Sequence, residues 1–78
     1  MNKDRRKEID SIIEVAEQLL ELIESIRNEE EEYRANMPEN LQYSVKGETA
    51  DEAISNLENA EGDLTTVISY LAEAKGEE

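Results

Sequence analysis

Apolar residues recur with heptad spacing in two long stretches of the chain, and the only proline, Pro38, falls between them. The first stretch covers residues 9–37 and the second covers residues 50–74. Apolar side chains spaced by three and four residues share one face of an α-helix. The sequence therefore predicts an all-α fold, in which one domain over residues 1–78 forms a two-helix antiparallel hairpin with a structured hinge.

Local signals predict where the helices begin and end. Proline disfavours helical geometry in the residue before it, so we expect the first helix over about 4–36 and the hinge over 37–48. Thr49 and Glu52 have the spacing of a capping box, in which each side chain bonds to the backbone amide of the other residue. This predicts a second helix over about 50–75. Its heptad continues in phase past Gly62, which favours one unbroken helix.

The hinge is longer than the two to five residues that suffice to close a helical hairpin. We expect one helical turn after Pro38, followed by Leu41, Tyr43 and Val45 folding over the open end of the hairpin. Either this loop only closes the hairpin, or its polar residues stay exposed and bind a partner. The candidate binding residues are Arg34, Asn36, Glu39, Asn40, Gln42 and Tyr43.

The apolar stripe of the first helix is wider than a single seam requires. With Ile9 at heptad position a, the a and d positions predict the contact between the two helices, and positions e and g are apolar as well. Apolar flanks indicate contact with more than one neighbouring helix. We therefore expect a homodimer or higher homo-oligomer, most simply a four-helix bundle. Its predicted interface consists of Ile13, Val15, Leu20, Leu22, Ile54 and Ile68.

Charge and composition argue against several classes of function. The chain has 21 acidic and 8 basic side chains, a net charge of -13, and neither His nor Cys. This charge repels nucleic acid and anionic membranes, and the usual general base and metal ligands are missing. The four glutamates Glu29, Glu30, Glu31 and Glu32 point in different directions on a helix and cannot share one metal ion. We expect a cytoplasmic protein that is not an enzyme and holds no metal or cofactor.

A basic cluster, Lys3, Arg5, Arg6 and Lys7, opens the first helix, where the helix dipole disfavours positive charge. In an antiparallel hairpin the end of the second helix lies beside this cluster. We expect Glu73, Glu77 and Glu78 to compensate the charge there, or the cluster to dock an anionic partner.

The hinge carries the one resemblance to known proteins. The segment Glu32-Tyr33-Arg34-Ala35-Asn36-Met37-Pro38-Glu39-Asn40-Leu41-Gln42 stands between a Glu-rich helix and an Ala/Leu/Ile heptad helix. It resembles short acidic helical-hairpin proteins of Firmicutes and their phages and plasmids, which share an N-x-P-E-N-L-Q motif. The resemblance implies a bacterial or phage origin and a helical hairpin, and it says nothing about catalysis.

Three kinds of binding role follow from these patterns. The first is an oligomeric interaction protein that binds another protein, such as a phage or mobile-element regulator or anti-defence factor. The second is a ligand-binding module that sequesters a small anionic molecule or nucleotide between protomers, using Arg27, Arg34, Lys46 or Tyr43 near the hinge. The third is an acidic mimic of nucleic acid. Clustering of the cations at the hinge would favour the second role.

Overall fold

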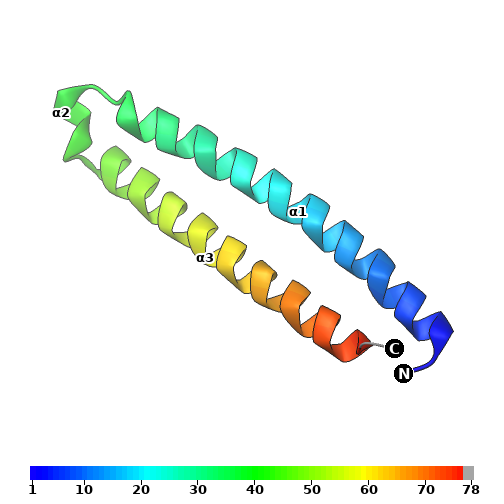
Figure 1. Ribbon diagram of the computed structural model, residues 1–78. Helices are drawn as coiled ribbons and strands as arrows, with labels where there is room; N and C mark the ends of the chain where they lie inside the picture. Colours follow the sequence, from blue (N-terminus) through cyan, green and yellow to red (C-terminus); the bar gives the residue numbers. More distant parts are fainter. Residues whose placement is uncertain (77–78) are drawn as a thin grey trace.

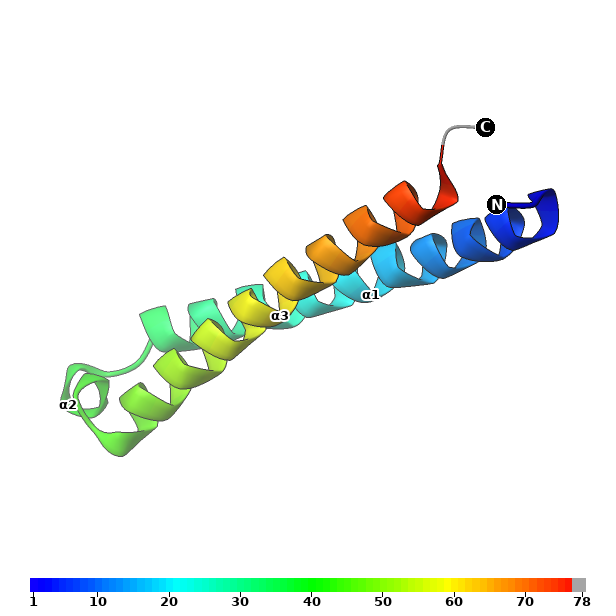
Figure 2. The same cartoon turned by 90° about the horizontal axis from the view of Figure 1, so that it is seen from below.

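The chain forms a long, thin helical hairpin. The computed structural model describes residues 1–76, in which α1 (Lys3–Ala35), the short α2 (Glu39–Gln42) and α3 (Val45–Lys75) follow one another. Helices α1 and α3 run antiparallel and side by side, with α2 at one end and the start of α1 beside the end of α3 at the other (Figures 1 and 2). The all-α hairpin predicted from the sequence is confirmed, with overall dimensions of 59 × 14 × 14 Å.

Helix α1 begins and ends at local signals. The Asn2 side chain caps its first turn by accepting a hydrogen bond of 2.8 Å from the backbone N–H of Arg5. Asn36 is the C-cap, and its own N–H bonds to the Glu32 carbonyl at 3.0 Å. The predicted end of the first helix before Pro38 is therefore confirmed, and so is the helical turn that follows, which is α2.

Helix α3 begins at Val45, about one turn before its predicted start. Ser44 is the N-cap, and the Ser44 carbonyl already accepts a helical hydrogen bond of 3.1 Å from the N–H of Glu48. The predicted start at the Thr49 capping box is therefore wrong, because Thr49 lies inside the helix. The predicted folding of Tyr43 and Val45 over the hairpin end is also wrong: both are exposed, and only Leu41 is half-buried there.

The close contact of Gly47 with α2 explains this early start. A Cβ atom on Gly47 would lie only 2.2 Å from the Gln42 carbonyl oxygen and 3.0 Å from that of Leu41. Only a residue without a side chain allows the first turn of α3 to pack so tightly under α2. Gly62 instead lies within an unbroken α3 and has open space around it, so the prediction of one continuous helix is confirmed.

The contact between the two long helices uses heptad positions a and e. On both helices most of the half-buried and buried residues recur at alternating spacings of three and four, and the residues of this series form the seam. The predicted contact through position a is confirmed. The predicted contact through position d is wrong on α1, because the d residues of α1 are about half exposed. On α1 the seam contains Ile9, Ile13, Ala16, Leu20, Ile23, Arg27, Glu30 and Arg34. On α3 it contains Ala50, Ile54, Leu57, Glu61, Leu64, Ile68, Leu71 and Lys75.

An ion pair joins the two long helices at the end of the hairpin opposite the hinge. Lys75 Nζ lies 2.7 Å from Asp10 Oδ1, which joins the last turn of α3 to α1. The compensation expected from Glu77 and Glu78 concerns residues outside the described part of the chain. Within residues 1–76, no helix has the length and apolar character needed to cross a membrane.

Candidate interaction surface

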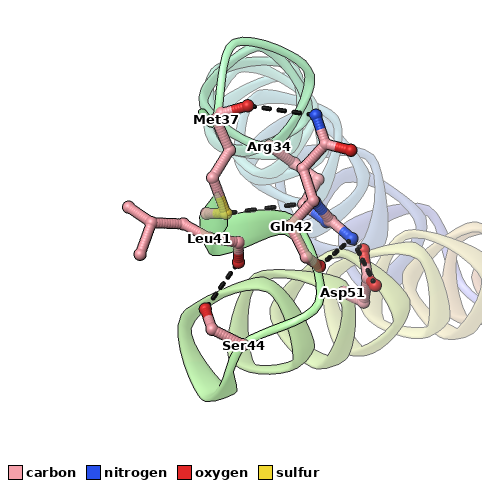
Figure 3. Close-up of polar contacts among 6 residues, drawn as sticks. All are labelled: Arg34, Met37, Leu41, Gln42, Ser44 and Asp51. Carbon is pink, nitrogen blue, oxygen red and sulfur yellow. Dashed lines mark hydrogen bonds and ion pairs between the residues drawn. The ribbon is translucent and has the colours of Figure 1, made fainter. Parts of the chain in front are cut away.

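Arg34 ties the last turn of α1 to α2 and α3. Its Nε and Nη2 atoms donate to the Asp51 carboxylate at 2.8 and 3.3 Å, and Nη2 also donates to the Gln42 carbonyl at 3.0 Å (Figure 3). The remaining Nη1 atom lies 3.9 Å from Met37 Sδ. The hydrogen bond from Arg34 lowers the pKa of Asp51, and the same bond raises the pKa of Arg34. Every nitrogen of this guanidinium is engaged within the hairpin.

Two further side chains complete the hinge around Arg34. Gln42 Nε2 donates to the Met37 carbonyl at 3.1 Å, and Ser44 Oγ donates to the Leu41 carbonyl (Figure 3). Met37 is buried beneath them, with 5% of its surface exposed. The hinge is therefore a packed and hydrogen-bonded structure.

The structure separates the six predicted binding residues of the hinge into two groups. Arg34 and Gln42 are partly buried and hydrogen-bonded, so they hold the hinge together. Asn36, Glu39 and Asn40 are exposed, and so is Tyr43 with 91% of its surface. These four remain accessible candidates for binding, whereas Arg34 has a structural role.

The cations near the hinge do not converge on a ligand site. Arg27 is hydrogen-bonded to Glu61 across the seam and to Glu31 one turn along α1, and these bonds raise the pKa of Arg27. Arg34 is hydrogen-bonded to Asp51 and to the Gln42 carbonyl. Lys46 is exposed on α3. The described residues enclose no pocket. The geometry thus gives no support to a small anionic ligand held by these side chains.

Large apolar side chains on the outside of α1 form a second stripe. The exposed residues lie at heptad positions d and g, beside the seam, with Val15 and Leu22 each 63% exposed. Two exposed residues of α3, Val67 and Tyr70, occupy the same heptad positions. We call this set the apolar face: Ile12, Val15, Leu19, Leu22, Ile26 and Tyr33 of α1 with Val67 and Tyr70 of α3.

Both parts of the apolar face lie on the same side of the hairpin. On α1, Leu19 comes one residue before the seam residue Leu20; on α3, Val67 comes one residue before the seam residue Ile68. Successive helical residues are about 100° apart, and the two helices run in opposite directions. The same offset from the seam therefore turns both stripes toward one side, where they form a surface two helices wide.

The six residues predicted to form an oligomer interface also fall into two groups. Ile13, Leu20, Ile54 and Ile68 are half-buried at seam positions within the hairpin, whereas Val15 and Leu22 belong to the apolar face. The sequence prediction omitted Ile12, Leu19 and Ile26 from the interface because it placed them in the contact between α1 and α3. The sequence signal that could have identified these residues is the presence of two overlapping apolar heptad stripes on α1.

Comparison with protein-family models, curated proteins and solved structures found no match. Within residues 1–76, no group of three or more acidic side chains is placed to hold a metal ion. The apolar face, the exposed hinge residues and the exposed cations Lys3, Arg5 and Lys7 at the start of α1 are thus accessible for binding.

Proposed function

We propose that this protein is a non-enzymatic interaction protein that works as a homodimer, with two hairpins pairing through their apolar faces in a four-helix bundle. The observation that carries the proposal is the stripe of six large apolar side chains exposed along α1. Burying a large apolar side chain stabilises a structure by about 1.5–3 kcal/mol relative to leaving it in water. A second hairpin is the simplest surface of matching length and character.

The small interior of one hairpin supports the same proposal. The hydrophobic residues that are buried within the described chain are Ala16, Met37 and Ala50, and two of these three are alanines. In a chain of about this size a single hydrophobic core rarely supplies more than about 3–5 kcal/mol of stability. The chain has no Cys with which to form a disulfide staple. Self-association therefore supplies apolar burial that the single hairpin lacks.

The paired hairpins leave the acidic outer faces and the exposed hinge residues Asn36, Glu39 and Asn40 free to bind another protein. A net charge of -13 per chain favours a basic protein surface as that partner. The role of a phage or mobile-element regulator stays a prediction from the resemblance of the hinge sequence. An anionic ligand is a weaker alternative, because Arg27 and Arg34 are already paired within the hairpin.

Co-expression of two differently tagged copies tests the proposal. Capture of one tag should recover the other in comparable amount after washing at moderate salt. The charge-introducing variant Leu22→Glu, placed in the middle of the apolar face, should abolish recovery. Glu21→Gln, which changes the neighbouring exposed residue outside the face, should leave recovery intact. Absence of the second tag in the unmodified protein would contradict the proposal.

A further inference from the structure

Two hairpins can pair through the apolar face in two symmetric ways. Which of the two is adopted is a question that rests on the proposed dimer. In the opposite-end arrangement α1 packs on α1 and α3 on α3, so the two hinges lie at opposite ends of the bundle. In the same-end arrangement α1 packs on α3 of the second copy, and both hinges lie together. Each is closed by a twofold axis and keeps facing helices antiparallel.

The ion pairs between the helices define which residues lie side by side. Lys75 pairs with Asp10 near one end, and Arg27 pairs with Glu61 nearer the other. Interpolation between these contacts places Leu19 beside Val67. Leu19 is also the middle residue of the run Ile12, Val15, Leu19, Leu22 and Ile26, so this level is the natural centre of a symmetric contact.

Charge is distributed unevenly on the two sides of this centre. Residues 20–66, the half that contains the hinge, carry 13 acidic and 3 basic side chains. On the other side, residues 1–19 and 67–76 carry 6 acidic and 5 basic side chains. Stacking two hinge halves brings the most negative regions together, whereas opposite-end pairing places each of them against the less negative half. Repulsion between like charges therefore favours the opposite-end arrangement.

Side chains at the ends of the apolar stripe match in the same way. Arg5 and Tyr33 occupy d positions on either side of the run, at nearly equal distances along the helix from Leu19. Opposite-end pairing brings Arg5 of each copy to Tyr33 and Glu29 of the other. A guanidinium is attracted both to the face of a tyrosine ring and to a carboxylate. Same-end pairing instead places Arg5 beyond Lys75 of the second copy.

Asp63 and Tyr70 provide a second match on α3. They lie at nearly equal distances on either side of Val67, and both are exposed. Opposite-end pairing lets the Tyr70 hydroxyl of one copy donate to the Asp63 carboxylate of the other, twice by symmetry. Same-end pairing packs that carboxylate against Leu22, which desolvates it without a hydrogen-bond donor.

Side-chain size alone favours the other arrangement. Same-end pairing would place Ile12 and Ile26 of α1 over Ala74 and Ala60 of the second copy, large against small. Size mismatches of this kind can be relieved by a small shift in the distance between helices. Such a shift does not supply a hydrogen-bond donor to the carboxylate of Asp63. It also does not remove the repulsion between two stacked hinge halves.

We infer that two copies of this chain pair in the opposite-end arrangement, with α1 on α1, α3 on α3, and Leu19 and Val67 near the twofold axis. The two hinges then lie about 50 Å apart, since each is about 18 residues from the axis at 1.5 Å per residue. A dimer of this kind presents its two hinge surfaces in opposite directions and can bridge two partner molecules.

Distances between spin labels test the inference, because the chain has no Cys and accepts single labelling sites cleanly. One label replaces Thr49, exposed at the hinge end of α3, and a matched label replaces Gln18, exposed beside the centre. We expect a distance of about 50 Å for Thr49→Cys and below about 25 Å for Gln18→Cys, because facing helices lie within about 10 Å.

Two other outcomes distinguish a wrong arrangement from the absence of a dimer. Short distances at both positions would overturn the opposite-end arrangement while leaving the dimer intact. The absence of a measurable distance at Gln18→Cys, at concentrations where Thr49→Cys also gives none, would show a monomer and would overturn the proposed function together with the arrangement.

Discussion

The hinge end and the middle of the hairpin differ in how far side chains are hydrogen-bonded or buried within one chain. At the hinge, Arg34, Gln42 and Ser44 bond to neighbouring groups, and Met37, Gly47 and Ala50 are buried. In the middle, Ala16 is buried, while Leu19 and Leu22 on the same helix are 47% and 63% exposed. Tyr43 and Val45 are exposed at the hinge, but its polar side chains are hydrogen-bonded within one chain. The middle instead exposes a continuous stripe of apolar side chains.

A charge introduced into the middle of the apolar face should abolish pairing, which is the strongest change that we expect. Leu19→Glu places two carboxylates near the twofold axis, and an unpaired buried polar group costs about 1–3 kcal/mol. We expect the dimer dissociation constant to rise by at least about 100-fold and the melting temperature to become independent of protein concentration.

Gln18→Glu is the control for this prediction, since it adds the same charge to an exposed neighbour outside the apolar face. Melting followed by circular dichroism at several protein concentrations gives the readout. Equal effects of the two variants would mean that charge alone, and not the apolar face, determines stability.

Alanine substitutions at Gly47 in the hinge end and at Gly62 in the middle of α3 should change stability in opposite directions. Gly47→Ala should destabilise the hairpin by about 1–3 kcal/mol, because the new Cβ would lie 2.2 Å from the backbone oxygen of Gln42. Gly62→Ala should stabilise it by up to about 1 kcal/mol, because the position is helical with nothing within 4 Å. Urea unfolding of both variants measures the difference. A tolerated Gly47→Ala would show that α2 does not pack against α3 as described.

A pH dependence confined to the hinge should change stability less than these substitutions. The pKa of Asp51 is lowered in the folded state by the hydrogen bond from Arg34. The pair therefore contributes its full stability above the unfolded pKa of about 4 and loses it as the pH falls through the lower folded value. We expect the stability difference between the unmodified protein and Asp51→Asn to be constant above about pH 5 and to shrink below about pH 4. A difference that stays constant down to pH 2 would mean that Arg34 and Asp51 are not coupled.

The sequence predicted the parts of the fold that local chemistry controls. The end of α1 before Pro38, the turn of α2, the continuity of α3 through Gly62 and its end at Gly76 all follow from neighbouring residues. The start of α3 did not, because it depends on contact between Gly47 and the α2 carbonyls, which are brought together only by the fold. The Thr49 capping-box pattern was present, but the helix already passes through it.

The contact through position d of α1 was predicted wrongly for a related reason. On α1 the stripes a/d and a/e are both apolar, so the helix alone does not choose between them. The choice depends on α3, where Ile54 and Ile68 at position e pack into the seam. Likewise, Arg34 was predicted to bind a partner or ligand. The sequence did not reveal that Arg34 would donate hydrogen bonds to Asp51 and to the Gln42 carbonyl.

The mass of the protein in solution shows whether two hairpins pair. Sedimentation equilibrium at micromolar concentrations and moderate salt should give twice the chain mass of 8.9 kDa, because the apolar face of each hairpin is covered by that of a second copy. A folded, highly helical species with the mass of a single chain over the whole concentration range would contradict the account.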